Sequence, residues 1–303
     1  MISVILPTYN PNPDFLQQTL AGLQQQTLPV HTWELIIVDN NSINGFTKNI
    51  NLQWHPAAKI ITEDRQGLTY ARLKGFHESK GELIVMVDDD NILSPGYLSQ
   101  VFAIFSQHSA VGAIGGISNP AFEVEPPVWL KKFYGSLALR NLGDTVKIVN
   151  WDNKYPESAP IGAGMGIRKE ALASYIKKIE TGNSNITDRI GNALSSGGDN
   201  DIVLEILKSG WQVGYFPSLQ LQHIIPGQRM QVNYLARLNN HSSKSWVQLL
   251  ESHGISSWQK IPRWTVPLRK LKSFFTYKAW KGNVSYIQWR GACGVFDGIG
   301  SIK

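Results

Sequence analysis

The sequence predicts an α/β fold in which strands and helices alternate along the first third of the chain. Short apolar runs at residues 2–6, 35–38 and 83–87 have the length and composition of buried strands. The stretches between them space their apolar residues as amphipathic helices do. Because alternating strands and helices form βαβ units, we expect a largely parallel sheet.

The remaining elements follow from local signals. A helix is expected from Pro13, because Asn12 is a favoured N-cap and proline suits the first helical position. Leu16, Leu20 and Leu23 then share one helical face. We further expect a strand at 59–62, helices at 70–79 and 199–209, and a strand at 213–216 that ends before Pro217.

Composition indicates a folded globular protein. The chain has 303 residues, 42% of them hydrophobic and 17% charged, which excludes a disordered polar chain. Cys293 is the single cysteine, so no intrachain disulfide can form, and we interpret it as a small buried hydrophobe. No secretory signal and no apolar run of about 18 residues is present, so we expect a cytoplasmic protein.

The C-terminal segment 260–303 is rich in Lys, Arg and Trp and carries a single acid, Asp297. Such a segment is typical of peripheral contact with the inner face of a membrane, with Trp258, Trp264, Trp280 and Trp289 at the headgroups. A helical lid over a substrate site and a plain solvated surface are the alternatives. No base-reading motif accompanies the positive charge, so we expect no nucleic-acid partner.

Polar clusters follow three of the predicted strands. They are Thr8-Tyr9-Asn10, Asp39-Asn40-Asn41-Ser42 and Asp88-Asp89-Asp90. Ligands of open α/β sheets bind beyond the carboxyl ends of the strands, so we expect the three clusters to meet at one edge. For Asp39 and its neighbours, ordinary turn chemistry is the alternative.

The Asp triplet is the strongest candidate for a metal site. Adjacent carboxylates repel one another unless a cation lies between them, and Mg²⁺ or Mn²⁺ prefers such oxygen ligands. In an extended segment Asp88 and Asp90 would point to the same side, one toward the metal and the other toward a ribose or a metal-bound water. An acidic turn or a helix N-cap is the alternative.

Four further residues are candidates for the same site. Arg72, early in a helix, suits phosphate or nucleobase recognition, with a surface salt bridge as the alternative. Asp199 or Asp201, after two glycines, suits a general base, although each also suits a helix cap. His223 suits a metal or a diphosphate, with a structural role as the alternative.

In combination these residues resemble the family 2 inverting glycosyltransferases, over about residues 1–240. The matching elements are Ser3-Val4-Ile5-Leu6-Pro7-Thr8-Tyr9-Asn10, Ile37-Val38-Asp39-Asn40-Asn41-Ser42, Ala71-Arg72, Val87-Asp88-Asp89-Asp90 and Gly198-Asp199-Asn200-Asp201. The resemblance implies a GT-A fold, a mixed sheet flanked by helices. It implies a catalytic domain at 1–234, with a nucleotide-binding half at 1–118 and an acceptor-binding half at 119–234, before a helical basic extension at 235–303.

The resemblance also implies the chemistry. A sugar would pass, with inversion, from a nucleotide-diphosphate donor of the UDP-sugar type to a glycan, lipid-linked or small-molecule acceptor, assisted by Mn²⁺ or Mg²⁺. Asp199 would be the catalytic base, and Asp90 and His223 would hold the metal. The donor-binding residues would be Pro7, Thr8, Tyr9, Asn10, Asp39, Asn41, Arg72, Asp88, Asp89 and Gly164, the last in a glycine-rich floor under the sugar.

The sequence departs from the family pattern at two places. Gly198 precedes Asp199 where the family often has an acid, and the Gln-x-x-Arg-Trp motif of processive synthases is not clearly present, so we expect one sugar per transfer. A nucleotidyltransferase that makes nucleotide sugars is one rival, although no Gly-rich pyrophosphorylase signature is found. A non-catalytic glycan-binding protein is another, and the intact Asp88, Asp90 and Asp199 argue against it.

Overall fold

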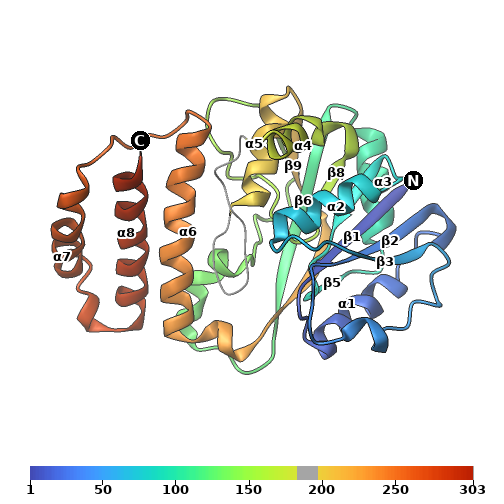
Figure 1. Ribbon diagram of the computed structural model, residues 1–303, viewed down its shortest axis with the longest axis horizontal. Helices are drawn as coiled ribbons and strands as arrows, with labels where there is room; N and C mark the ends of the chain where they lie inside the picture. Colours follow the sequence, from blue (N-terminus) through green and yellow to red (C-terminus); the bar gives the residue numbers. More distant parts are fainter. Residues whose placement is uncertain (183–196, 303) are drawn as a thin grey trace. The chain divides into compact units, whose positions relative to one another are not determined.

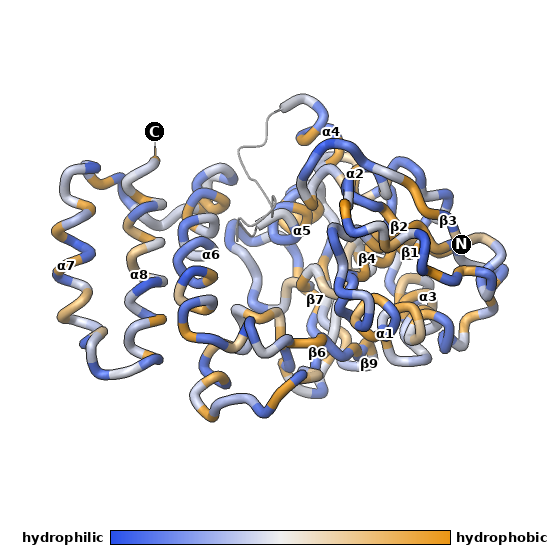
Figure 2. Tube along the Cα trace, turned by 60° about the horizontal axis from the view of Figure 1, so that its bottom comes forward, coloured by the Kyte–Doolittle hydropathy of each residue, from blue (hydrophilic) through white to orange (hydrophobic). Residues whose placement is uncertain are grey.

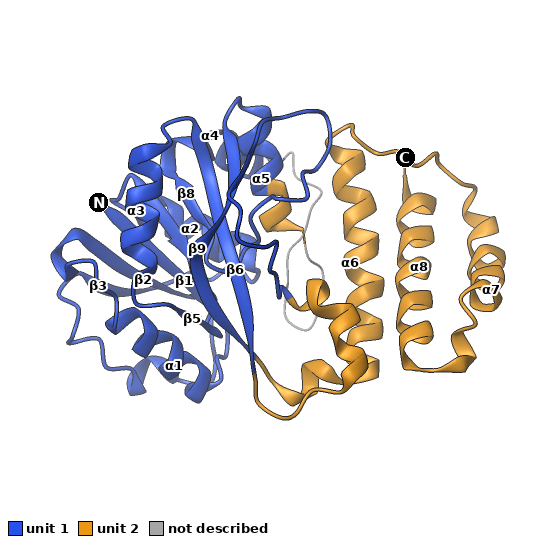
Figure 3. Ribbon diagram, turned by 180° about the vertical axis from the view of Figure 1, so that it is seen from behind, with its two compact units in different colours: residues 1–121, 138–183, 202–224 blue, residues 122–137, 184–201, 225–303 orange. Residues whose placement is uncertain are grey.

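The computed structural model describes residues 1–182 and 197–302, which form two compact units (Figures 1 and 3). Unit 1 comprises residues 1–121, 138–183 and 202–224, and unit 2 comprises 122–137, 184–201 and 225–303. The domain boundaries at residues 118 and 234 remain predictions.

Unit 1 is built on a mixed sheet. In the part of the chain that the structure describes, the strand order is β3-β2-β1-β4-β8-β6-β9-β5, with β7 beside β9. The first four strands are parallel, whereas β8 runs antiparallel to β4 and to β6, and β5 and β7 run antiparallel to β9. The strands are β1 (Ile2–Thr8), β2 (Trp33–Asp39), β3 (Ala58–Thr62), β4 (Leu83–Met86), β5 (Asn91–Leu93), β6 (Val111–Phe122), β7 (Lys147–Val149), β8 (Gly166–Arg168) and β9 (Gln212–Ile225). The largely parallel sheet expected from the βαβ pattern is therefore wrong beyond β4, and the mixed sheet of the GT-A fold is confirmed.

Helices cover both faces of this sheet, because the side chains of its central strands alternate between two cores. Ile2, Val4 and Leu6 of β1 pack with α1 (Pro13–Gln24) and α3 (Tyr97–Gln107), whereas Ile5 packs on the opposite face. The opposite face is covered by α2 (Leu68–Glu78), α4 (Ala173–Glu180) and α5 (Gly198–Lys208). Hydrophobic residues accordingly run through the central strands in Figure 2.

Two local predictions have opposite outcomes. The predicted start of α1 is confirmed, because Asn12 accepts hydrogen bonds from the backbone N–H groups of Asp14 and Phe15 and proline follows it. The predicted end of a strand before Pro217 is wrong, because β9 continues to Ile225. Pro217 lies between the residues paired with β7 and those paired with β5, where neither ladder needs its missing N–H.

In the part of unit 2 that the structure describes, three α-helices follow residue 231, which confirms the helical C-terminal extension. They are α6 (Val232–Ser252), α7 (Val266–Thr276) and α8 (Asn283–Ser301), and α8 lies between the other two (Figure 3). A Cβ atom at Gly294 of α8 would collide with the α6 backbone at Asn240, and one at Gly298 would collide with the Val247 side chain of α6. Among the described residues, none of the helices has the length and apolar character needed to cross a bilayer.

Candidate functional site

The carboxyl ends of β1, β2 and β4 bring two predicted clusters and the Asp triplet to one edge of unit 1. Thr8 at the end of β1 is paired with Asp39 at the end of β2. The hydroxyl of Thr8 also donates a hydrogen bond to the Asp89 carboxylate, which ties β1 to the segment after β4. The convergence expected from the strand ends is therefore present.

The Asp triplet forms a turn rather than an extended segment. The backbone N–H of Asn91 donates to the carbonyl of Asp88 at 3.1 Å, and the N–H of Asp88 donates to the side-chain oxygen of Asn91 at 3.3 Å. The expectation that Asp88 and Asp90 extend β4 and point to one side is therefore wrong, because β4 ends at Met86. The acidic turn instead gives them different surroundings: the Asp88 side chain is 35% exposed and that of Asp90 is 8% exposed.

Asp90 lies beside His223, the other residue predicted to hold the metal. His223 Nε2 is 3.4 Å from the Asp90 carboxylate, because Asn91 pairs with His223 across the β5–β9 ladder. The side-chain amide of Asn91 donates to the same carboxylate at 3.1 Å. A buried carboxylate and an imidazole side by side fit a divalent cation, the carboxylate suiting Mg²⁺ or Mn²⁺ and the imidazole favouring Mn²⁺.

The segments after β1 and β2 hold each other by hydrogen bonds. The backbone N–H of Asn10 donates to the Ser42 hydroxyl at 2.8 Å, and the N–H of Ser42 donates to Asp39 at 2.9 Å. Asn10 and Asn41 adopt left-handed conformations with φ of 47° and 63°, which asparagine tolerates well. The Asp39 carboxylate thus stabilises the turn after β2, which is the role that the sequence left open as an alternative. Of the other residues predicted here, Pro7 is buried within β1, whereas Tyr9 is exposed beyond the strand.

Asn40 was given no role by the sequence reasoning, yet it fixes the loop between β3 and α2. Its side-chain amide donates to the carbonyls of Glu63 and Arg65 at 3.0 and 2.7 Å and accepts from the backbone N–H of Gly67 at 2.7 Å. Arg65 in turn pairs with Glu63 at 2.8 Å, and this hydrogen bond lowers the pKa of the Glu63 carboxyl. The sequence alone gives no signal that Asn40, within a polar turn sequence, would be buried.

Arg72 is buried on α2 and approaches the acidic turn. Its guanidinium lies 4.0 Å from the Asp88 carboxylate, and its side chain is almost fully covered. The sequence left a surface salt bridge open as the alternative, but the Arg72 side chain is only 5% exposed, so its contact with Asp88 is not of that kind. Arg72 on α2 is therefore positioned to hold the Asp88 side chain in place.

Gly164 lies next to the acidic turn, because Met165 pairs with Met86 at the end of β4. It adopts φ of +73°, and its carbonyl accepts a hydrogen bond from the Tyr97 hydroxyl at 2.6 Å. A Cβ atom at this position would come within 2.5 Å of that hydroxyl, so only glycine fits. Tyr97 is a further residue that sequence reasoning missed, and its burial raises the pKa of its hydroxyl.

The two candidate bases lie at the start of α5, in unit 2, and differ sharply. Asp201 is buried and contacts His253 Nε2 at 2.6 Å, and both side chains are 1% exposed. Asp199 is partly exposed, and its carboxylate accepts a hydrogen bond from the backbone N–H of Asn200 at 3.0 Å. Asp201, Glu205 and His253 offer ligand atoms within 4.8 Å of one another, whereas Asp199 keeps a partly exposed side chain.

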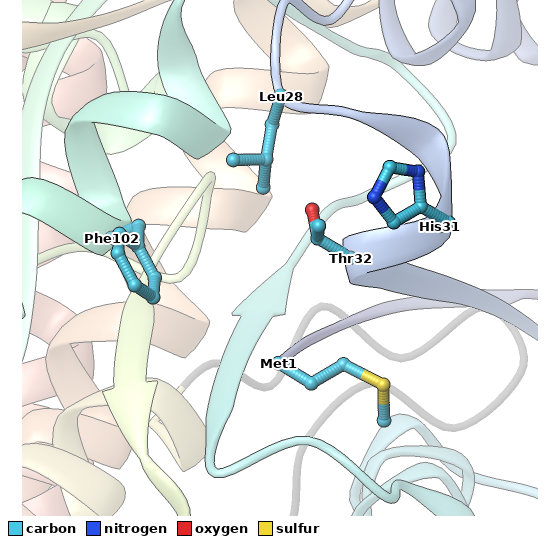
Figure 4. A pocket seen from close by; sticks show the side chains of 5 residues that line it. All are labelled: Met1, Leu28, His31, Thr32 and Phe102. Atoms are coloured by element: carbon cyan, nitrogen blue, oxygen red, sulfur yellow. The ribbon is translucent and has the colours of Figure 1, made fainter.

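An apolar pocket of about 400 Å³ lies elsewhere in unit 1 (Figure 4). It is lined by Met1, Leu28, His31, Thr32 and Phe102. Met1 precedes β1 and Thr32 precedes β2, so the pocket lies at the amino ends of the parallel strands, whereas the acidic turn follows a carboxyl end. It is therefore not part of the predicted site.

Comparison with known proteins agrees with the resemblance stated from the motifs. The family model described as glycosyl transferase family 2 matches residues 3–176. Glycosyltransferase AglE of Haloferax volcanii is 37% identical over 93 residues, which is 29% of this chain and 30% of that protein. The chain spans 30–42% of the length of three curated relatives that it matches.

Solved structures share the fold. The mannosyltransferase PcManGT of Pyrobaculum calidifontis, solved with GDP-Man and Mn²⁺, matches with a TM-score of 0.59 at 18% identity, covering 96% of this chain and 73% of that one. S. aureus TarS 1–349, solved with UDP, matches with a TM-score of 0.55 at 14% identity, covering 96% and 90%. These similarities show a common fold for the described chain.

Proposed function

The chain belongs to glycosyl transferase family 2, and from that premise we propose that it transfers a sugar from a nucleoside-diphosphate donor to an acceptor hydroxyl. The observation that carries the proposal is the acidic turn after β4. It places a buried carboxylate, Asp90, beside His223 and a more exposed one, Asp88, beside Arg72. Solved proteins of the same fold bind UDP or GDP-Man, which supports a nucleotide-sugar donor here.

Asp90 and His223 are the residues that would hold a divalent cation. When bound, Mn²⁺ or Mg²⁺ supplies positive charge to the departing diphosphate. Arg72 fixes Asp88, while the Thr8–Asp89 hydrogen bond fixes the turn against β1, so the carboxylates are preorganised. Mn²⁺ in the PcManGT complex supports this assignment by analogy.

The donor would lie over the loops that follow β1 and β2. Asn10 and Asp39 accept hydrogen bonds from backbone N–H groups in that region, and Asn41 adopts a left-handed conformation there. The Asn40 amide keeps the neighbouring loop at 63–67 in place. We propose Gly164, next to the turn, as part of the floor under the donor sugar; its missing side chain lets the Tyr97 hydroxyl and Leu221 pack against the backbone there. We propose a UDP-sugar as the donor, and a glycan, lipid-linked or small-molecule hydroxyl as the acceptor.

Asp199 is our choice for the general base. An inverting transfer needs a carboxylate that takes the proton from the attacking hydroxyl. Asp201 is buried against His253, whereas the Asp199 side chain is partly exposed to solvent. Asp199→Asn should abolish transfer but leave nucleotide binding intact, because the substitution removes the proton acceptor and preserves the shape.

Nucleotide binding tests the site without knowledge of the acceptor. Thermal unfolding of the full chain is measured with UDP or GDP, with Mn²⁺ or with EDTA. At a nucleotide concentration 100 times Kd, binding should stabilise the chain by about 2.7 kcal/mol. The stabilisation should vanish in EDTA and in Asp90→Asn, and should persist in Asp14→Asn, a matched change in the exposed first turn of α1.

Two results would contradict the proposal. Equal stabilisation by nucleotide in EDTA and in Asp90→Asn would remove the metal role. With a nucleotide sugar and candidate acceptors, release of pyrophosphate instead of a nucleoside diphosphate would indicate a nucleotidyltransferase.

A further inference from the structure

Helix α7 exposes an apolar stripe. Leu268, Leu271 and Phe275 are spaced by three and four residues, so they share one face of the helix, and each is 58–60% exposed. Trp264, 74% exposed, precedes the helix, and Trp280, 56% exposed, follows it. We call the surface formed by these five side chains the α7 surface.

The side of α7 that packs on α8 is mixed: the Phe274 ring lies 5.2 Å from that of Trp289, and Val266 lies against Gly300. Ser273 is buried there, and Lys270 pairs with Asp297 of α8 at 2.6 Å. The indole N–H of Trp289 on α8 donates to the carbonyl of Lys270 at 3.1 Å. A surface helix of a globular protein ordinarily turns its apolar stripe toward the core. In α7 the stripe of Leu268, Leu271 and Phe275 stays exposed in addition to the side chains that pack on α8, which indicates a further partner.

The charge around the stripe identifies that partner. Residues 263–281 contain no Asp or Glu, and their Lys and Arg residues are Arg263, Arg269, Lys270, Lys272, Lys278 and Lys281. A second copy of the chain would bring two such positive surfaces together, which is unfavourable. Nucleic acid would match the charge but leave the leucines and phenylalanine in water. An anionic bilayer matches both the charge and the apolar stripe.

We propose that the α7 surface binds the face of an anionic lipid bilayer. The helix lies in the plane of the interface, with Leu268, Leu271 and Phe275 below the headgroups and the tryptophans at headgroup level. With 11 residues, α7 is too short to span the membrane. The inference rests on the residues of unit 2 alone and does not depend on the proposed transferase activity.

Vesicle flotation with the full chain tests the inference. The chain should float with vesicles of phosphatidylcholine and phosphatidylglycerol, float less in high salt, and stay behind with phosphatidylcholine alone. Leu271→Glu combined with Phe275→Glu should lower the partition coefficient on the order of a hundredfold, because two buried apolar side chains become charged. Phe102→Glu is the control, since Phe102 is 49% exposed on α3 of unit 1 and should leave flotation unchanged.

Each remaining outcome overturns the proposal. Undiminished flotation of the double variant would mean that another surface binds lipid. Equal loss in Phe102→Glu would mean that any added negative charge suffices. Absence of flotation together with a dimer that the double variant dissociates in sedimentation velocity would assign the α7 surface to a second copy. Thermal unfolding of each variant, measured in parallel, shows that a loss of flotation comes from a folded protein.

Discussion

Gly164→Ala should destabilise unit 1 because the site of substitution combines a left-handed backbone with close packing. The residue has φ of +73°, and a Cβ atom there would approach the Tyr97 hydroxyl to 2.5 Å and a methyl group of Leu221 to 2.6 Å. Tyr97 is fully buried and donates to the Gly164 carbonyl, so its ring cannot move away without losing that hydrogen bond.

The expected cost is the sum of two terms. A left-handed conformation costs alanine roughly 1–2 kcal/mol relative to glycine, and overpacking of a filled interior costs about 1–3 kcal/mol more. We therefore expect a loss of about 2–5 kcal/mol in the free energy of unfolding. Urea unfolding followed by circular dichroism measures it, and UDP affinity should fall in the same variant, because Gly164 lies next to the acidic turn.

Gly143→Ala is the matched control. Gly143 has φ of +85°, but a Cβ atom there would meet nothing within 4 Å, so only the backbone term of roughly 1–2 kcal/mol should remain. In the Tyr97→Phe background, Gly164→Ala should cost less, because the nearest colliding atom is gone. The reasoning is refuted if Gly164→Ala and Gly143→Ala cost the same, or if Tyr97→Phe leaves the cost unchanged.

Three further predictions concern buried polar groups. Asp201→Ala should cost about 3–5 kcal/mol of stability, because it leaves the buried His253 side chain without its partner. Asp297→Ala removes one member of the partly exposed pair with Lys270 and should cost under about 1 kcal/mol. Equal costs in urea unfolding would contradict this prediction. Burial lowers the pKa of His55 below 6.5, so the unfolded chain binds more protons there, and stability present above pH 6.5 should be lost as the pH falls. The unfolding midpoint should depend less on pH in His55→Asn than in the unchanged chain. Identical pH profiles would exclude His55 as the source of this dependence. Asn40→Asp should cost at least about 2 kcal/mol and weaken UDP binding, because a carboxylate cannot donate to the two carbonyls that the amide holds; calorimetry showing unchanged affinity would refute the second part.

The strand ends were predictable from the sequence because they depend on local patterns. Short apolar runs, the Asn12 cap and the polar residues after each strand are short-range signals, and they located the edge where Thr8, Asp39 and the Asp triplet meet. The family motifs then supplied the fold that the βαβ pattern alone described only in part. Strand direction beyond β4 could not be predicted, because it depends on pairings between distant segments.

The chemistry inside the site was less predictable. Tertiary contacts determine the roles of three residues, and neither spacing nor composition reports them. Asn40 fixes the loop at 63–67, Asn91 shapes the acidic turn, and Tyr97 hydrogen-bonds to Gly164. The choice between Asp199 and Asp201 likewise depended on His253, which lies far along the chain. The assignments of residues to donor, metal and proton transfer remain predictions for the experiments above.

The acidic turn also has a mechanical consequence for the sheet. It joins β4, in the middle of the strand order, to β5 at its far end, with only residues 87–90 between them. A flat sheet would separate those strands by about 19 Å, the full reach of a stretched linker of that length. Because the linker is bent at a turn, the sheet must curl to close the gap.

The number of residues in the linker at 87–90 is therefore matched to the curvature of the sheet. One added residue would shift β5 by one position against β9, turn its side chains to the opposite face, and carry Asn91 away from His223. The spacing of the carboxylates is thus constrained twice, by the cation they would bind and by the closure of the strands that hold them. An insertion there would be costly even in a protein that had no need of a metal.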